Sequence, residues 1–465
     1  MAEILVDDPG AVRRSVLNRP FQKVLVANRG AAASRIIRAL GELDIASVAI
    51  FSEADAKAPY LHAATEAFCI GAPPARESYL RADKIIAVAR ESGADAIHPG
   101  YGFLSENAAF AHAVADAGMT FIGPSPRWIE AMGHKTEARD LMRRHGMPVA
   151  AGSELLDEGG DIAAAARKIG YPVLVKPAAG GGGIGMIIAQ DEASLSRGVE
   201  RARSLATRSF SNGQVYLERY LARPRHIEFQ LLADRYGAAR HLFERDCSLQ
   251  RRYQKVVEEA PAPALPRDAL GAIADVATGI LAGLGYDNIG TIEMLRADDG
   301  GFSFLEMNTR LQVEHAVSEM VTGIDIVKAQ IRLAAGAAIA DVLPEEVDVD
   351  GHAVEARIYA EDPQSFMPSP GRLERFRPCS PKPGLRIETG YAQGCEVTPF
   401  YDPMLAKVIA HGATRDEALD TLATALVDFE VQGVKTNIPF ILRALRHGPF
   451  RAGAIHTGLA AEIAN

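Results

Sequence analysis

The chain has 465 residues and a formal net charge of −9, and 48% of its residues are apolar. This length predicts two or three domains, and the acidic balance argues against a nucleic-acid partner, because proteins that bind phosphate backbones are usually basic. No apolar run approaches the ~20 residues that cross a bilayer, and residues 1–20 lack an apolar secretory core. We therefore expect a cytoplasmic protein without a membrane partner. Its four scattered cysteines should be free thiols, not zinc ligands.

Residues 21–133 follow the N-terminal extension and predict a parallel sheet with flanking helices. Apolar runs at 23–28 and 46–51 enclose a segment with helical spacing at 34–43, and the alternation continues to residue 133. The first turn reads Asn-Arg-Gly instead of G-x-G-x-x-G. A dinucleotide site is therefore poorly supported.

Residues 134–223 predict a small α+β module. A helix at about 136–145 leads to strands at 171–177 and 185–190, and these two strands are joined by a run of glycines. A helix at 192–205 and a strand at 214–221 complete the module.

The remainder predicts strands first and mixed structure later, which we divide into regions 224–345 and 346–465. A hairpin turns at 234–237, and on its first strand polar and apolar residues alternate, as in a half-buried strand. We expect helices at 267–284 and 322–336, and a final helix near 436–446.

The glycine run at 180–183 has two interpretations. It could be a flexible linker, or it could be a loop that lies against phosphate. Glycines let backbone N–H groups approach an anion, and Lys176, at the end of the preceding strand, adds a positive charge. The spacing is not that of a P-loop. Because the loop returns at once to an apolar strand, we favour a flap that closes over a nucleotide.

Two glutamates point to a metal. In a hairpin that turns at 298–301, Glu293 lies opposite or nearly opposite Glu306, and Asn308 shares a face with Glu306. Like charges that face each other are destabilising unless a cation lies between them. These oxygen ligands suit Mg²⁺ or Mn²⁺. The alternative is that both glutamates lie on a solvated face.

Further charges lie on either side of this hairpin. Arg310, Gln312 and Glu314 form a polar stripe just after it, beside an anion or metal site. The stretch 250–263 carries Arg251, Arg252 and Lys255, followed by Val256 and Val257. It could be a solvated basic patch, but we favour a fixed strand that directs some of these charges inward.

Motifs along nearly the whole chain, from about residue 21, closely resemble those of the biotin carboxylases, a family of ATP-grasp ligases. They are VANRG, HPGYGFLSEN, MGHK, KPAAGGGGIGM, ERDCSLQRRYQKVVEEAPAP, EMNTRLQVEH, EARIYAEDP and YDPMLAK, in this order. The resemblance implies an ATP-grasp fold of mixed α/β and α+β class. The regions then correspond to a preATP-grasp domain (21–133), a linker helix and flap domain (134–223), an ATP-grasp C-terminal subdomain (224–345) and a biotin carboxylase C-terminal domain (346–465).

The resemblance also implies a reaction, in which ATP phosphorylates bicarbonate to carboxyphosphate and biotin on a carrier protein is then carboxylated. Transferred by motif, the expected catalytic residues are Lys255, Arg310, Glu314 as general base and Arg357, which stabilises the biotin anion. Two Mg²⁺ or Mn²⁺ ions would bind Glu293, Glu306 and Asn308. ATP would contact Lys135, Lys176, Gly181, Gly182, Gly183, Glu218, Leu221, His226, Gln250 and Tyr253. Bicarbonate and biotin would contact Tyr101, Gln312, Val313 and Arg357.

Four positions depart from the family pattern. Ala31 replaces a glutamate, Ile184 an arginine of the flap, Tyr253 a histidine and Ala316 a proline. The change at 253 keeps a hydroxyl but removes a group that can become cationic near neutral pH. With Ile184, it could weaken ATP binding or flap closure.

The resemblance implies partners as well: a biotin carboxyl carrier protein, a separate subunit with carboxyltransferase activity, and a second copy of this chain in a homodimer. No Met-Lys-Met biotinylation motif occurs, so the carrier is either a separate protein or a part of a longer chain. Two other functions stay open. One is an ATP-grasp ligase with a different acceptor, suggested by Ala31, and the other is a nucleotide-binding subunit without catalysis.

Overall fold

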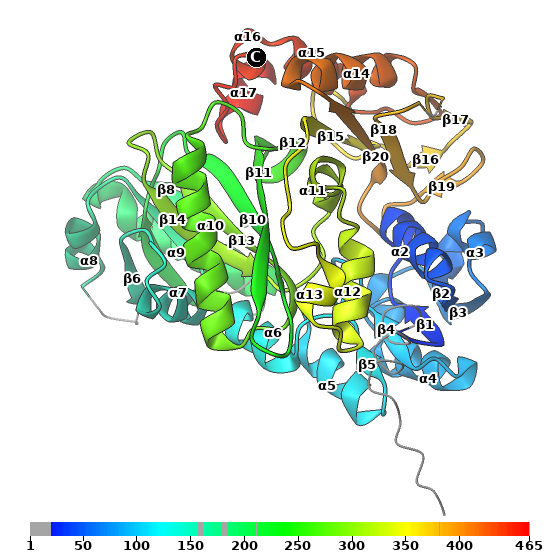
Figure 1. Ribbon diagram of the computed structural model, residues 1–465. Coiled ribbons are helices and arrows are strands. Elements are labelled where there is room, and N and C mark those ends of the chain that lie inside the picture. Colours follow the sequence, from blue (N-terminus) through cyan, green and yellow to red (C-terminus); the bar gives the residue numbers. More distant parts are fainter. Residues whose placement is uncertain (1–19, 157–160, 179–184, 211, 381, 465) are drawn as a thin grey trace, which may run out of the picture.

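The computed structural model describes residues 20–156, 161–178, 185–210, 212–380 and 382–464. Its N-terminal part is a five-stranded parallel sheet in the order β3-β2-β1-β4-β5 (Figure 1), as the sequence predicts. The strands are β1 Lys23–Val26, β2 Ala46–Ser52, β3 Glu66–Gly71, β4 Ala96–His98 and β5 Thr120–Phe121. The helices that accompany them are α2 Gly30–Glu42, α3 Tyr60–Ala63, α4 Ala82–Ser92, α5 Ala108–Asp116 and α6 Pro126–Gly133.

Helix α7 (Lys135–Arg144) leads into a small domain built on a four-stranded sheet, β6-β9-β7-β8. The predicted hairpin is confirmed, because β7 (Val173–Pro177) pairs antiparallel with β8 (Ile187–Ala189). The glycine run between them, with Gly181, Gly182 and Gly183, and Ile184 lie outside the described residues. The other elements are β6 Gly152–Leu155, α8 Ile162–Ile169, α9 Glu192–Phe210 and β9 Val215–Arg219.

The centre of the molecule is an eight-stranded antiparallel sheet in the order β14-β13-β10-β11-β12-β15-β20-β18. The strands are β10 Arg225–Ala233, β11 Ala239–Arg251, β12 Gln254–Ala260, β13 Asn288–Arg296, β14 Phe302–Asn308, β15 His352–Tyr359, β18 Leu385–Thr389 and β20 Met404–Gly412. Helix α10 (Arg267–Leu284) packs its apolar face on β10 and β13. The sheet crosses the expected boundary between regions 224–345 and 346–465 without interruption (Figure 1).

The rest of the C-terminal half is mainly helical. Its elements are α11 His315–Thr322, α12 Ile326–Ala334, α13 Ile339–Val342, α14 Arg415–Val427, α15 Ile438–Arg446, α16 Gly448–Arg451 and α17 Leu459–Ala464, with two short strand pairs, β16 Gly371–Arg372 with β19 Glu396–Val397 and β17 Arg375–Arg377 with β21 Glu430–Gln432. Helices α14 and α15 cover the apolar face of β15 and β20.

Three local predictions were wrong. The single helix expected at 322–336 begins only at Ile326, after Gly323 ends α11 in a left-handed conformation and Asp325 caps α12. The helix near 436–446 is followed by α16 and α17 and is not the last. Strand β10 is buried on both faces and not half-buried, because its polar face is covered by the site described next.

The C-terminal half also contacts the N-terminal sheet at one point where only glycine fits. A Cβ atom at Gly390 would lie 2.2 Å from the carbonyl carbon of Gly30. This close approach brings Tyr401 beneath Arg29, whose Cζ lies 4.3 Å from the ring centroid. The two halves therefore meet at the start of α2, beside the cavity described next.

Candidate active site

A cavity of about 1140 Å³ lies among the N-terminal sheet, the small domain and the eight-stranded sheet. Every candidate residue that the structure describes lines it: Tyr101, Lys135, Lys176, Glu218, Leu221, His226, Gln250, Tyr253, Lys255, Glu293, Glu306, Asn308, Arg310, Gln312, Val313, Glu314 and Arg357. Only Gly181, Gly182 and Gly183 fall outside the described residues. The sequence motifs thus converge on one site, although they are spread over more than 250 residues.

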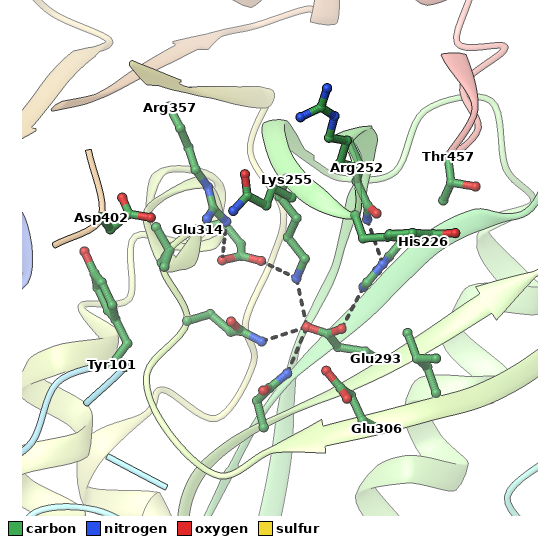
Figure 2. A pocket seen from close by; sticks show the side chains of 18 of the residues that line it. Tyr101, His226, Arg252, Lys255, Glu293, Glu306, Glu314, Arg357, Asp402 and Thr457 are labelled. Carbon is green, nitrogen blue, oxygen red and sulfur yellow. Dashed lines mark hydrogen bonds and ion pairs between the residues drawn. The ribbon is translucent and has the colours of Figure 1, made fainter. Parts of the chain in front are cut away.

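The expected opposition of the two glutamates is confirmed. Glu293 on β13 and Glu306 on β14 are direct partners in the sheet, with Asn308 two residues further along the same strand. Figure 2 shows both carboxylates pointing into the same part of the cavity. Glu306 is the more accessible of the two, and its Oε2 lies 3.2 Å from Lys135 Nζ at the start of α7.

Glu293 is surrounded by donors. Its Oε1 receives Lys255 Nζ at 2.8 Å, Asn308 Nδ2 at 2.9 Å and Gln312 Nε2 at 3.1 Å, and its Oε2 lies 2.9 Å from His226 Nε2. Burial alone would raise the pKa of Glu293, but Lys255 and His226 hold it well below the ordinary value. The carboxylate is therefore ionised at neutral pH.

These residues fit a hard divalent cation. Two carboxylates on adjacent strands and a carboxamide are the oxygen donors that Mg²⁺ and Mn²⁺ prefer, and the thiol of Cys247 contacts Glu314 and not this pair. Asn308 as placed donates its Nδ2 to Glu293, and its Oδ1 accepts from Arg310 Nη2 at 2.8 Å. Rotation of this amide by half a turn would direct the oxygen toward Glu293.

Lys255 is the centre of the site. From β12 its Nζ reaches Glu228 Oε2 and Glu314 Oε1, both at 2.6 Å, in addition to Glu293. Figure 2 shows the contacts with Glu293 and Glu314. Burial would lower the pKa of Lys255, but the three carboxylates together raise it well above its ordinary value. One ammonium group therefore holds three acidic side chains from three different elements at one point.

Glu314, at the beginning of α11, lies between two cations. Its Oε1 contacts Lys255, and its Oε2 accepts from Arg357 Nη2 at 3.0 Å. Burial would raise the pKa of Glu314, but Lys255 and Arg357 hold it well below its ordinary value. A carboxylate in this state is ionised and free of a proton, as a general base must be before it reacts.

Arg310 is held by Glu106, whose Oε2 accepts from Arg310 Nε at 2.9 Å, and its Nη1 donates to Gln312 Oε1 at 2.8 Å. Tyr101 lies on the opposite side of the cavity, near Asp402 (Figure 2). The three cations Arg310, Lys255 and Arg357 thus surround a space that suits a small anion.

The small domain contributes a second charged cluster. Glu218 on β9 pairs with Lys176 Nζ at 3.1 Å and forms a close ion pair with Arg139 of α7. Burial would lower the pKa of Lys176, but Glu218 raises it above the ordinary value. Lys176 therefore stays charged although it is buried.

Tyr253 lies at the mouth of the cavity and not in its depth. It forms a two-residue turn with Arg252 between β11 and β12, both residues have positive φ, and its side chain is half exposed. Of the three cations in this stretch, Lys255 points inward, Arg252 lines the mouth and Arg251 pairs with Glu361. The expectation that some of these charges are directed inward is confirmed.

Reasoning from sequence missed several contributors. The first is Glu228, which contacts Lys255 and is held in turn by buried Arg245. The second is Thr457 near the C-terminus, which lines the cavity because its backbone N–H donates to Pro224 O at 2.9 Å. The alternation of His226, Glu228 and Gln230 carried a signal for the first, but by itself it predicts only a half-buried strand. No local pattern signalled the second.

Comparison with protein families gives three consecutive matches. Residues 20–129 match the biotin carboxylase N-terminal domain, residues 134–342 the ATP-binding domain of the carbamoyl-phosphate synthase L chain, and residues 355–462 the biotin carboxylase C-terminal domain. A biotin carboxylase of Halalkalibacterium halodurans is 48% identical over 94% of this chain and 96% of its own length. A biotin carboxylase of Pseudomonas aeruginosa is 46% identical over 94% of this chain and 97% of its own.

Solved structures are similar along the same length. The biotin carboxylase domain dimer of Hydrogenobacter thermophilus 2-oxoglutarate carboxylase, in complex with MgADP, ADP and bicarbonate, aligns with a TM-score of 0.92 at 43% identity, over 96% of this chain and 99% of its own. A Campylobacter jejuni biotin carboxylase in complex with β,γ-ATP also aligns with a TM-score of 0.92, at 40% identity, over 95% of this chain and 99% of its own.

Proposed function

Because this chain belongs to the biotin carboxylase family, we propose that it is an ADP-forming ligase that uses ATP and bicarbonate to carboxylate biotin on a carrier protein. The observation that carries the proposal is the position of Lys255. It joins Glu293, expected to bind metal, to Glu314, expected to act as base, in one cavity. Phosphorylation of bicarbonate by ATP and removal of the bicarbonate proton can therefore occur at the same bound bicarbonate ion.

The cationic residues would hold the substrates. Lys135 and Lys176 are placed for the phosphates of ATP, with Gly181 to Gly183 as the expected flap over them. Glu218, Leu221, His226, Gln250 and Tyr253 complete the nucleotide side. Mg²⁺ or Mn²⁺, held by Glu293, Glu306 and Asn308, would neutralise negative charge on the phosphates of ATP.

Bicarbonate would lie among Lys255, Arg310, Gln312 and Val313, within reach of Glu314. An anion that shares Lys255 with Glu314 weakens that ion pair, and this raises the proton affinity of the carboxylate. Glu314 then accepts the proton of bicarbonate, and a bicarbonate oxygen attacks the γ-phosphorus of ATP as ADP leaves. Carboxyphosphate is the product of this step.

The second half of the reaction takes place on the side of Tyr101 and Arg357. Carboxyphosphate delivers its carboxyl group to the ureido nitrogen of biotin, and the phosphate that leaves takes up the proton that this nitrogen loses. The guanidinium of Arg357 balances the negative charge that develops on the ureido oxygen. Closure of the small domain would exclude water, which otherwise hydrolyses the activated intermediate.

We further propose that the chain acts as a homodimer, with a biotin carboxyl carrier protein and a carboxyltransferase as partners. A relative solved as a dimer supports the first part. Size-exclusion chromatography with light scattering tests it, and a mass of one chain at micromolar concentration would contradict it.

One assay tests the activity. ADP release is measured with saturating Mg²⁺ and bicarbonate, with and without free biotin. Turnover that requires bicarbonate and is stimulated by biotin is the expected result. ATP turnover that occurs only with another acceptor, or nucleotide binding without turnover, would each contradict the proposal.

A further inference from the structure

A row of buried charges crosses one face of the eight-stranded sheet behind Arg357. Its members are Glu258 on β12, Glu355 and Arg357 on β15, Lys407 on β20 and Glu388 on β18. Glu258 is the direct partner of Glu355, Arg357 of Lys407, and Lys407 of Glu388, so all five side chains lie on the same face. We call them the buried charge row. Of its members only Arg357 lines the cavity.

The row contains an arrangement that is unfavourable for folding. Glu258 and Glu355 are fully buried and face each other across two strands, where ionisation of both acids would destabilise the sheet. Apolar residues would fill this position at a lower cost. A buried pair of acids directly behind a residue of the site therefore suggests a requirement of the site.

The contacts of Glu258 lead to Arg357. Glu258 Oε1 lies 2.6 Å from Arg357 Nε, while Arg357 Nη2 donates to Glu314 Oε2 at 3.0 Å. The contact with Arg357 Nε is an ion pair, and among the described residues neither oxygen of Glu258 makes a hydrogen bond. We propose that Glu258 is a positioning residue, which fixes the guanidinium of Arg357 from behind so that its far end reaches Glu314 and the cavity.

The other end of the row supports the same segment. Lys407 Nζ lies 2.9 Å from Glu388 Oε2 and 3.4 Å from Glu355 Oε2, and it donates a close hydrogen bond to the backbone oxygen of Val313. Arg357 thus holds the side chain of Glu314 while Lys407 holds the backbone beside it. Because Lys407 neutralises Glu355, Arg357 remains available to Glu258.

The protonation state of Glu258 decides how it should be tested. Burial raises its pKa to about 8, opposed by Arg357 and Lys255 and assisted by Glu355 and Glu314. Near neutral pH the group is therefore largely an uncharged carboxyl. Glutamine has the same length and a neutral oxygen acceptor, so it is the closest mimic. Aspartate keeps the acid but is shorter by one methylene.

The test compares Glu258→Asp with Glu258→Gln in the full-length protein. Aspartate withdraws the oxygen by ~1.5 Å, and we expect kcat for biotin-dependent ADP release to fall ~10- to 100-fold with an unchanged KM for ATP. Glutamine should keep kcat within about threefold of wild type, because it preserves the reach. Wild-type kcat in the aspartate variant, or equal loss in both variants, would overturn the proposal.

Glu259→Gln is the matched control. Glu259 is the next residue on β12 and points to the opposite face, where His352 Nε2 at 2.8 Å and Arg415 Nη2 at 3.0 Å hold it. We expect this variant to lose thermal stability without a change in kcat. A loss of kcat equal to that of Glu258→Asp would show a general effect of buried acids on folding, and would contradict a positioning role.

The kinetic test of Glu258 depends on the proposed function, but a crystallographic test does not. Crystal structures of wild type and Glu258→Asp should show Arg357 Nη2 beyond hydrogen-bonding distance of Glu314 in the variant only. An unmoved Arg357 would overturn the positioning role. If wild type shows no biotin-stimulated turnover, the proposed function fails, while the crystallographic comparison still decides on Glu258.

Discussion

The cavity has two buried charged clusters, each built around one group of opposite charge. Around Lys255, a single ammonium faces the carboxylates of Glu228, Glu293 and Glu314. In the second cluster, the single carboxylate of Glu218 faces both Lys176 and Arg139. Arg245 and Arg357 also contact Glu228 and Glu314, so the first cluster is balanced, whereas the second has more bases than acids.

The difference indicates which ligand each cluster is suited to receive. Buried charge is costly unless it is neutralised, so the surplus of bases around Glu218 favours an added anion, and the facing carboxylates of Glu293 and Glu306 favour an added cation. A divalent metal and the phosphates of a nucleotide satisfy both demands together. The two clusters are therefore complementary parts of one site for metal and ATP.

The strongest test of this comparison is Glu314→Gln, which keeps the shape of the Lys255 cluster but removes its base. We expect carboxylation to fall by ~10²–10⁴-fold, the usual contribution of a positioned general base. Nucleotide affinity, measured by titration calorimetry, should stay close to that of wild type. Full activity in this variant would show that Glu314 is not the base.

The facing carboxylates of Glu293 and Glu306 are tested as a metal site by Glu306→Gln. This substitution should raise the Mg²⁺ concentration for half-maximal rate by about tenfold or more, because one charged oxygen donor is lost. Titrating the rate with Mg²⁺ measures the effect. Asp298→Asn, in the exposed turn of the same hairpin, is the control and should leave the Mg²⁺ requirement unchanged.

The surplus of bases in the small domain is tested by Lys176→Met. Loss of a charged contact to phosphate should raise the KM for ATP ~10- to 100-fold, corresponding to about 1.5–3 kcal/mol. Lys168→Met, on the exposed surface of α8, is a matched control for the loss of one positive charge. An unchanged KM in Lys176→Met would separate this cluster from the nucleotide.

Within the buried charge row, Glu258 should respond to pH in the direction opposite to Glu314. The pKa of Glu258 rises on folding from 4.5 to about 8, so its contribution to stability is fully present below 4.5 and is lost as pH rises through about 8. Glu314, with a lowered pKa, loses its contribution as pH falls instead. Between about pH 6 and about pH 8.5, the Tm of Glu258→Gln should therefore rise relative to wild type. A constant difference in Tm would refute this.

The smallest effect is expected at the mouth of the cavity. Tyr253→His restores the residue type typical of the family and adds a group that can become cationic near the phosphates. The KM for ATP should be unchanged or lower by at most a few fold, since the side chain is half exposed and screened by solvent. Steady-state kinetics with varied ATP measure this, and a marked rise in KM would contradict this account of position 253.

The opposition of Glu293 and Glu306 could be predicted from sequence because a tight turn fixes the register of a hairpin, and register decides which side chains face each other. The parallel order of the N-terminal strands followed from the alternation of strands and helices for a similar local reason. The convergence of Lys255, Glu314 and Arg357 has no local cause. It was expected only from the resemblance to a family.

Other features could not be predicted from the sequence, because the burial of a residue depends on the tertiary structure. The polar face of β10 has the pattern of a solvated face, and nothing in the strand itself reveals that Glu228 is enclosed by Arg245 and Lys255. Glu258 likewise follows two valines in the sequence, and this pattern does not distinguish a buried acid from an exposed one. The contact of Thr457 with Pro224 joins residues more than 200 positions apart, which periodicity cannot detect.

The uninterrupted sheet has a consequence for how this protein can be divided. Cutting the chain between residues 345 and 346 would remove β15, β20 and β18 and leave the edge of β12 bare, with the backbone groups that now pair with β15 unsatisfied. An exposed strand edge of this kind pairs readily with a strand of another chain and so promotes aggregation. The last 120 residues are thus structural partners of the nucleotide-binding core, and evolution or engineering can exchange them only by replacing three of the sheet's eight strands.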